Sequence, residues 1–174
     1  RDQMGTILKY ADKRLGRARS SRDRLARVHE VLEQVRMRDP ERVSRSYPIE
    51  LSGGMRQRIL IAMALLSEPK LLIADEPGTA LDVTTQAQIL KLLKDLVQAR
   101  GLALLMITHN LGVVRETSDH VYVMNKGVVV EHGPAADIFA APQHDYTKSL
   151  IAAVPRLTGG MRFGQSATTP EATP

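Results

Sequence analysis

Two short apolar runs separated by one amphipathic segment constrain the fold of this sequence most. Residues 71–74 and 102–107 are uninterrupted apolar runs, and residues 82–99 between them carry Ile and Leu at helical spacing. A short run that is apolar throughout is typical of a strand buried on both faces of a parallel sheet. The order strand, helix, strand therefore predicts an α/β protein whose parallel strands are joined by crossover helices.

Polar residues follow both predicted strands. Asp75-Glu76 comes after the first run, and Thr108-His109 comes after the second. Ligands of α/β sheets bind at the carboxyl ends of the strands, where these residues would lie. One carboxylate there could hold Mg²⁺ while its neighbour orients or deprotonates a water. The plain alternatives are a pair of solvated acids and a surface or capping histidine.

The rest of the pattern is mostly helical. Asn125-Lys126-Gly127 is flanked by two apolar segments and predicts a β-hairpin. Asp39-Pro40-Glu41 is expected to start a short turn or helix, because proline is tolerated at the first helical position. The composition from Pro155 onward predicts a disordered tail. Further helices are expected over residues 4–11, 25–35, 55–66, 111–116, 134–139 and 146–154.

Composition excludes several classes of protein. The chain has no Cys, which rules out disulfides, thiolate catalysis and Cys-ligated zinc or iron–sulfur sites. It has no Trp, two Phe and four Tyr, so base stacking on aromatic platforms is not expected and neither is nucleic-acid binding. The longest apolar run, residues 59–66, is far shorter than the roughly 18–20 residues of a membrane-spanning helix.

The positive charge is unevenly distributed. Residues 1–50 hold 13 Lys and Arg against 8 Asp and Glu, whereas residues 51–174 hold 11 of each, so the whole net charge of +5 lies in the first 50 residues. Such an excess could face a partner protein or an anionic bilayer. A solvated helical face is the plain alternative.

A Ser-Gly-Gly turn, Ser52-Gly53-Gly54, precedes the helix expected at 55–66. The two glycines let backbone N–H groups approach an anion closely, and the N-terminus of the helix would point toward it. Ser52 could add a hydroxyl donor. Such a turn alone is weak evidence of a binding site, and it becomes specific only together with the two strand ends that follow.

In order and spacing, four stretches resemble the nucleotide-binding domain of the ATP-binding-cassette (ABC) ATPases. They are LSGGMRQR (51–58), LLIADEP (71–77), TALD (79–82) and ITHN (107–110). The resemblance implies a P-loop NTPase-like parallel sheet core, incomplete in this chain, with an α-helical subdomain. It implies ATP and Mg²⁺ as cofactors.

The resemblance also implies roles for single residues. Those of the signature motif would contact ATP held by the opposite subunit of a head-to-tail dimer; they are Ser52, Gly53, Gly54 and Gln57. Asp75 matches the magnesium residue of the Walker B motif, and Glu76 matches its catalytic base. Asp82 matches the D-loop aspartate that couples the two sites, and His109 matches the switch histidine that contacts the γ-phosphate.

The flanking segments narrow the resemblance. Tyr47-Pro48 and the stretches 111–139 and 142–157 are similar to the oligopeptide/dipeptide importer branch, which also includes nickel and glutathione importers. Several members of that branch carry a Cys-bound iron–sulfur cluster in the C-terminal tail. This chain has no Cys and therefore cannot.

The sequence departs from the family pattern in three ways. It contains no GxxxxGK[ST] motif, so the lysine that holds the β- and γ-phosphates is missing. The glutamine loop is not identifiable, and Arg1 falls just after its expected position. Gly78 stands where the branch commonly has Thr or Ser, which would add backbone freedom beside the catalytic base. We therefore expect the C-terminal portion of a longer protein, inactive in isolation.

These observations predict three segments: a helical subdomain with the signature motif (1–66), the second half of the ATPase core (67–140) and a C-terminal extension (141–174). The leading hypothesis is part of an ATPase subunit that powers a peptide-type importer. Its partners would be transmembrane permease subunits and a second ATP-binding subunit, at the cytoplasmic face of the inner membrane. The alternatives are a soluble ABC ATPase of DNA repair or translation and a non-catalytic fragment.

Overall fold

The computed structural model describes residues 3–153, and the predicted disordered tail lies outside them. The chain divides into two compact units, one ending at Thr117 and the other beginning at Ser118. This division falls inside the predicted segment 67–140 and coincides with neither of its boundaries. The three predicted segments therefore stay a prediction. Each unit is described by itself below.

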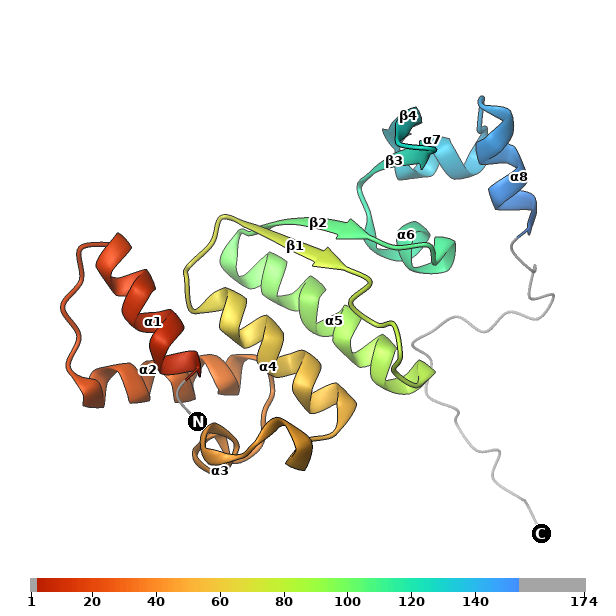
Figure 1. Cartoon of the computed structure of the whole chain (residues 1–174). Coiled ribbons are helices and arrows are strands. Elements are labelled where there is room, and N and C mark those ends of the chain that lie inside the picture. Colours follow the sequence, from red (N-terminus) through yellow and green to blue (C-terminus); the bar gives the residue numbers. More distant parts are fainter. Residues whose placement is uncertain (1–2, 154–174) are drawn as a thin grey trace, which may run out of the picture. The chain divides into compact units, whose positions relative to one another are not determined.

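The first unit contains helices and one pair of strands (Figure 1). Its elements are α1 (Gln3–Arg14), α2 (Ser21–Gln34), α3 (Pro40–Arg45), the 3-10 helix η1 (Pro48–Glu50), α4 (Gly53–Leu65), β1 (Leu71–Asp75), α5 (Val83–Arg100), β2 (Ala103–Ile107) and α6 (Leu111–Thr117). All the helices expected here are present. Helix α4 begins two residues earlier than expected, so both glycines of the Ser-Gly-Gly turn lie in its first turn.

Local capping explains where these helices begin. The Ser20 hydroxyl accepts a hydrogen bond from the Asp23 backbone N–H at 3.2 Å, and the Asp23 carboxylate accepts one from the Ser20 N–H, so each satisfies a donor of the other. Asp39 caps α3 by accepting from the Arg42 N–H at 3.1 Å, with Pro40 at the first helical position. The start of α3 was predicted from Asp39 and Pro40, because capping residues act within one turn.

Strands β1 and β2 pair in parallel, as the strand–helix–strand order predicts. Leu71 lies opposite Ala103, and Asp75 lies opposite Ile107. The Glu76 N–H continues the ladder by donating to the Ile107 carbonyl at 2.9 Å. The carboxyl ends of the two strands therefore meet at the same edge.

The expectation that both faces of these strands are buried is wrong. Leu72 is buried, but Leu71 and Ile73 are 50% and 60% exposed. In β2, Leu105 and Ile107 are 47% and 50% exposed. Side chains alternate across a strand, so the helices of this unit cover one face of the pair and leave an apolar face open.

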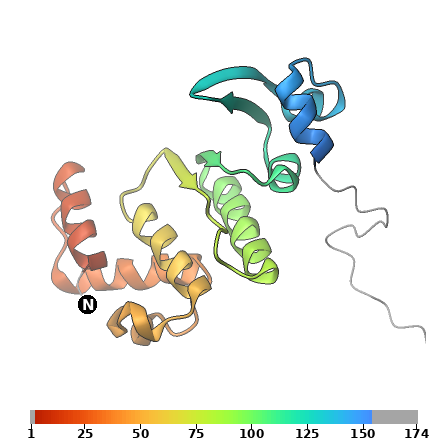
Figure 2. The same cartoon turned by 45° about the vertical axis from the view of Figure 1, so that its right-hand side comes forward.

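One hydrophobic core joins the helices to the sheet. Helices α4 and α5 lie side by side in both views (Figure 1; Figure 2). Leu65 of α4, Leu93 of α5 and Leu72 of β1 belong to the same cluster of buried residues as Leu8 and Leu32 of α1 and α2. Leu25, near the start of α2, is 49% exposed, and the buried residues of this helix begin at Val28.

The second unit is a hairpin followed by two short helices: β3 (His120–Asn125), β4 (Val128–Pro134), α7 (Ala135–Ala140) and α8 (Asp145–Ala153). The hairpin was predicted, and its antiparallel pairing carries a register shift between Val123 and Met124. His120 lies on β3 and His132 lies on β4. Their exposed rings lie 5.1 and 5.5 Å from the ring of Tyr122, measured between centroids.

Within residues 3–153, none of the helices combines the length and the apolar character that crossing a bilayer requires.

Candidate functional site

Glu76 follows β1 directly and has an unusual backbone conformation. Its φ is 46°, in the left-handed region that residues other than glycine rarely adopt. Two backbone hydrogen bonds hold this conformation: the Glu76 N–H donates to Ile107, and the Glu76 carbonyl accepts from the Thr79 N–H at 3.1 Å. The chain therefore turns sharply at the strand end and directs the Glu76 side chain toward the end of β2.

The Glu76 carboxylate accepts hydrogen bonds from both neighbouring segments. Oε1 lies 2.6 Å from Nδ1 of His109 and 3.0 Å from its backbone nitrogen. Oε2 accepts from the Thr79 hydroxyl at 2.8 Å and lies 3.4 Å from the Thr108 hydroxyl. The hydrogen bond from Thr79, followed by those from His109, lowers the pKa of Glu76 below its ordinary value. Glu76 is therefore held as a carboxylate.

His109 has one ring nitrogen occupied and one available. An ionised carboxylate only accepts hydrogen bonds, so Nδ1 of His109 must donate to Glu76. The His109 side chain is 83% exposed, which leaves Nε2 accessible. With Nδ1 protonated, Nε2 donates to a phosphate oxygen only when the ring is a doubly protonated imidazolium.

Asp75 lies at the end of β1, exposed and beside Glu76. Magnesium is commonly held by one or two carboxylates together with water and substrate phosphates. In residues 3–153 no group of three or more His, Cys, Asp or Glu is arranged to hold a metal ion. One exposed carboxylate fits a Mg²⁺ ion held mainly by nucleotide and water, and does not fit a metal held by protein ligands alone.

The Ser-Gly-Gly turn forms the start of α4. Ser52 is the N-cap, and its hydroxyl oxygen accepts from the Met55 N–H at 3.3 Å. Because a hydroxyl both accepts and donates, the Ser52 hydrogen remains free to donate. Gln57 is half-buried in the same helix. The turn therefore exposes a hydroxyl and the first N–H groups of a 13-residue helix, as an anion site requires.

The start of α5 packs against this turn. A Cβ on Gly54 would come within 2.6 Å of the Thr85 methyl carbon, and one on Gly53 within 3.1 Å of a Leu81 methyl carbon. Asp82 caps α5 by accepting from the Thr85 N–H at 2.9 Å. Hydrogen bonding by Thr85 lowers the pKa of Asp82. The turn at Ser52-Gly53-Gly54, called the signature turn below, therefore packs tightly against the segment around Asp82.

The predicted site residues therefore fall into two groups. Glu76 and His109 bond to each other at the strand ends, with Asp75 beside them in the sequence. Gly53 and Gly54, which follow Ser52, lie against Leu81 and Thr85 at the start of α5. No hydrogen bond joins the two groups among the residues that the structure describes.

Two parts of the chain match models of known protein families. Residues 3–79 match the model of the ABC transporter family, and residues 130–174 match that of the oligopeptide/dipeptide transporter C-terminal region. Residues 3–79 thus carry the sequence pattern of the ABC transporter family. The predicted resemblance is thereby confirmed, including the branch indicated by the segments after the hairpin.

Similar proteins carry names of the same kind. The peptidoglycan transport ATP-binding protein YejF of Agrobacterium fabrum is 53% identical over 88% of this chain, which spans 27% of that relative. The glutathione import ATP-binding protein GsiA of Salmonella typhimurium is 51% identical over 86% of this chain, which spans 24% of it. The chain therefore corresponds to about a quarter of the length of these ABC relatives.

Solved structures of ABC proteins share the fold. An ATP-binding cassette in a dimeric post-hydrolysis state with ADP and phosphate superimposes with a TM-score of 0.64 at 29% identity, over 76% of this chain and 56% of that one. The CbiO1 component of an ABC transporter complex from Clostridium perfringens gives 0.62 at 29% identity, over 75% and 51%. The predicted fold class, an α/β sheet core with helices, is confirmed.

Two residues that donate hydrogen bonds to Glu76 were not identified as its partners from the sequence. Thr79 and Thr108 both direct hydroxyls at its carboxylate. Thr79 lies three residues after Glu76, a spacing at which a hydroxyl can bond back within one turn. Gly78 of this turn is buried, and a Cβ there would come within 2.4 Å of the Gln86 side chain. Glycine at this position therefore permits a close contact with α5.

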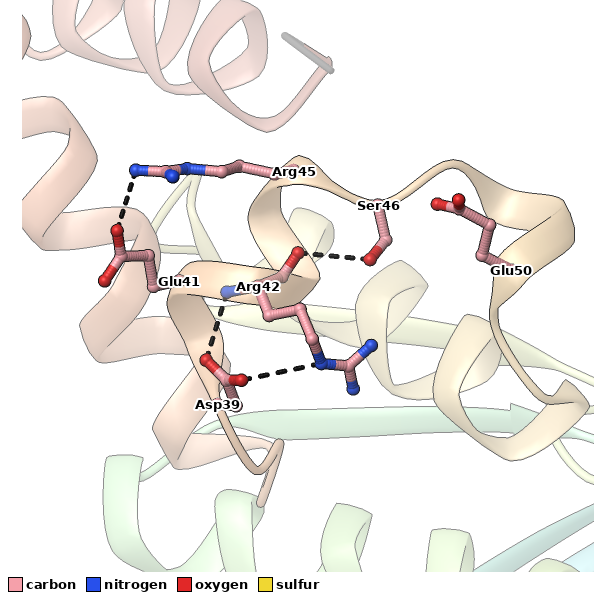
Figure 3. Close-up of a pocket in the computed structure, with 6 residues that line it drawn as sticks. All are labelled: Asp39, Glu41, Arg42, Arg45, Ser46 and Glu50. Carbon is pink, nitrogen blue, oxygen red and sulfur yellow. Dashed lines mark hydrogen bonds and ion pairs between the residues drawn. The ribbon is translucent and has the colours of Figure 1, made fainter.

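Part of the positive charge of the first 50 residues is neutralised by ion pairs with carboxylates elsewhere in the first unit. Three arginines of the α1–α2 region surround Glu68, which follows α4; they are Arg17, Arg19 and Arg27. Arg36 pairs with Asp95 of α5. A cavity of about 490 Å³ beside α3 is also charged, but Arg45 pairs there with Glu41 and Arg42 with Asp39 (Figure 3). These ion pairs favour an ordinary, internally paired helical surface.

Proposed function

We propose that this chain forms part of an ATP-binding subunit that hydrolyses ATP and powers a peptide-type importer. The observation that carries the proposal is the Glu76 carboxylate at the meeting ends of two parallel strands, ionised and bonded to His109 and Thr79. The matches to the ABC transporter family and to the oligopeptide/dipeptide transporter region support the transport role.

In this proposal Glu76 acts as the general base. Its carboxylate would accept a proton from the water that attacks the γ-phosphate, and His109 would donate from Nε2 to a γ-phosphate oxygen. Asp75 would hold Mg²⁺, which supplies charge neutralisation to the phosphates. A loose phosphoryl transition state needs a positioned water and charge neutralisation more than covalent chemistry, and these residue types supply both.

The signature turn would act on a second nucleotide. Ser52 and the N–H groups at the start of α4 form a donor surface suited to phosphate oxygens. Ser52, Gly53, Gly54 and Gln57 would contact ATP held by a second ATP-binding subunit. Asp82 would couple the two sites, because its helix cap packs directly on the signature turn.

The open apolar face of β1 and β2 supports a larger functional unit. Leu71, Ile73, Leu105 and Ile107 are each about half exposed on one side of the strand pair. Further protein covering this face would bury them. The chain also contains no GxxxxGK[ST] sequence. We therefore propose that ATP turnover requires a P-loop segment in addition to these residues.

Transmembrane permease subunits would be the other partners, and the subunit would lie at the cytoplasmic face of the inner membrane, attached through them. A soluble ABC ATPase of DNA repair or translation is disfavoured by the transporter-type C-terminal match and by the pairing of the basic residues. The chain by itself would be non-catalytic.

The decisive test is Glu76→Gln in a protein that carries a P-loop segment from a close relative in frame before this chain. We expect ATP turnover in the unmodified fusion and a loss of about 100-fold or more in the variant, because the amide cannot accept the proton. Thr6→Val on the exposed side of α1 serves as a control. Equal turnover in the fusion and the Glu76→Gln variant would refute the assignment.

A further inference from the structure

We propose that Thr79 is a positioning residue, which fixes the Glu76 carboxylate oxygen that faces the attacking water. The inference rests on the proposed function, because a water must attack at this site. It concerns a hydroxyl in the turn between Walker B and the D-loop. Three observations carry it: the occupancy of the two carboxylate oxygens, the backbone of the turn and the packing behind it.

The two oxygens of Glu76 differ in how many donors they already have. Each carboxylate oxygen accepts about two hydrogen bonds. Oε1 has two, from Nδ1 and the backbone N–H of His109, at 2.6 and 3.0 Å. Oε2 has one short bond, from the Thr79 hydroxyl at 2.8 Å, and a long 3.4 Å approach from Thr108. Oε2 is therefore the oxygen with room for a water.

Thr79 delivers its hydroxyl from a fixed backbone. Its N–H donates to the Glu76 carbonyl at 3.1 Å, which closes a turn over Pro77 and Gly78. Pro77 and Gly78 are buried, whereas Thr79 itself is exposed. The turn fixes the backbones of Thr79 and Glu76 relative to each other, so the Thr79 hydroxyl lies within reach of the Glu76 side chain.

Helix α5 supports the turn from behind. The Gln86 side chain packs so closely on Gly78 that a Cβ there would come within 2.4 Å of its Cγ. Asp82 caps the same helix four residues before Gln86. The direction of Oε2 is therefore set through Thr79 by the backbone turn, and the turn is set by α5.

Removing the hydroxyl frees Oε2 without removing the carboxylate. In a Thr79→Val variant, His109 still holds Oε1, but the Glu76 side chain, 33% exposed, can rotate about that anchor. A misplaced base lowers the rate of the chemical step and leaves ATP binding unchanged. Thr79→Ser keeps the hydroxyl and is the matched rescue.

The kinetic test uses the ATP-hydrolysing fusion described above. We expect Thr79→Val to lower kcat by about 10- to 100-fold, with the KM for ATP within about twofold of the unmodified protein. Thr79→Ser is expected to stay within about threefold, and Thr6→Val to leave kcat unchanged. The proposal is overturned if Thr79→Val retains full kcat while Glu76→Gln loses it, or if Thr79→Ser falls as far as Thr79→Val.

A second measurement on the chain itself does not depend on hydrolysis. Three-bond NMR couplings across the Cα–Cβ bond report the rotamer of Glu76. We expect one dominant rotamer in the unmodified chain and in Thr79→Ser, and averaged couplings in Thr79→Val. Identical couplings in all three would overturn the positioning role, whatever the fusion shows. A failure of Glu76→Gln to affect turnover would instead refute the proposed function.

Discussion

At Gly54, the absence of one methyl group decides how closely the signature turn approaches α5. A Cβ on Gly54 would lie 2.6 Å from the Thr85 methyl carbon, closer than two carbon atoms can pack. Alanine normally stabilises a helix relative to glycine by up to about 1 kcal/mol. Here overpacking opposes that gain, at a cost of about 1–3 kcal/mol.

We therefore predict that Gly54→Ala lowers the free energy of unfolding by about 1 kcal/mol or more. Thr85→Ser removes the clashing methyl carbon and keeps the hydroxyl, so it should recover most of the loss in the double variant. Urea unfolding of the four proteins in this double-mutant cycle gives the coupling energy, expected at about 1 kcal/mol. Additive effects of the two substitutions would contradict the close packing of Gly54 on Thr85.

At the residue scale, the sequence predicted which strand ends carry the candidate site residues, but it did not predict all the hydrogen bonds that these residues make. The meeting of Glu76 and His109 was predictable, because carboxyl ends of parallel strands share one edge. The hydrogen bond from Thr79 was not, because it depends on a left-handed φ at Glu76 that no residue pattern indicates. The roles assigned to all the site residues stay predictions; these residues are Ser52, Gly53, Gly54, Gln57, Asp75, Glu76, Asp82 and His109.

At the scale of elements, capping predicted helix starts well, whereas burial was harder to predict. Asp39 caps α3 where expected, because a cap acts within one turn. The exposed face of β1 was missed because an apolar strand does not show which faces its neighbours cover. The hydrogen bonds between Glu131 of β4 and the backbone just before α8 were also not predicted, because they join residues 12 and 13 positions apart in the sequence.

Glu131 accepts these hydrogen bonds, and its pKa predicts a dependence on pH. Its two carboxylate oxygens accept from the backbone N–H groups of Gln143 and His144, at 2.7 and 3.1 Å. These bonds, chiefly that from Gln143, lower the pKa of Glu131. Since the folded pKa lies below the ordinary value of about 4.3, the stabilisation is complete above that value and is lost as pH falls through the folded pKa.

We therefore expect the amide resonances of Gln143 and His144 to shift in NMR spectra as pH falls from about 5 to 2, when Glu131 is protonated. Glu131→Gln should abolish the acidic shift of both amide resonances, because the amide side chain does not titrate. An unchanged acidic shift in that variant would assign it to another carboxyl group.

At the scale of the first unit, one core connects the helical segment to the strand pair. Leu65 of α4 is fully buried in a cluster that extends from Leu32 of α2 to Leu92 and Leu93 of α5 and to Leu72 of β1. Ion pairs between Glu68 and arginines of the α1–α2 region tie the same parts at the surface. The sequence change near residue 50, from basic to neutral, therefore does not mark a boundary in the packing.

This shared core predicts that α2 and α5 lose stability together. Leu65→Ala leaves a cavity between them and should lower the free energy of unfolding by about 2–5 kcal/mol. Leu60→Ala, in the same helix but 57% exposed, is the matched control and should change it by about 0.5 kcal/mol or less. In native-state hydrogen exchange, slowly exchanging amides of α2 and of α5 should lose protection equally in Leu65→Ala. Loss confined to α2 would show that the helical segment unfolds independently of the strand pair, and the signature helix would then lack the rigid support that the proposed ATPase requires.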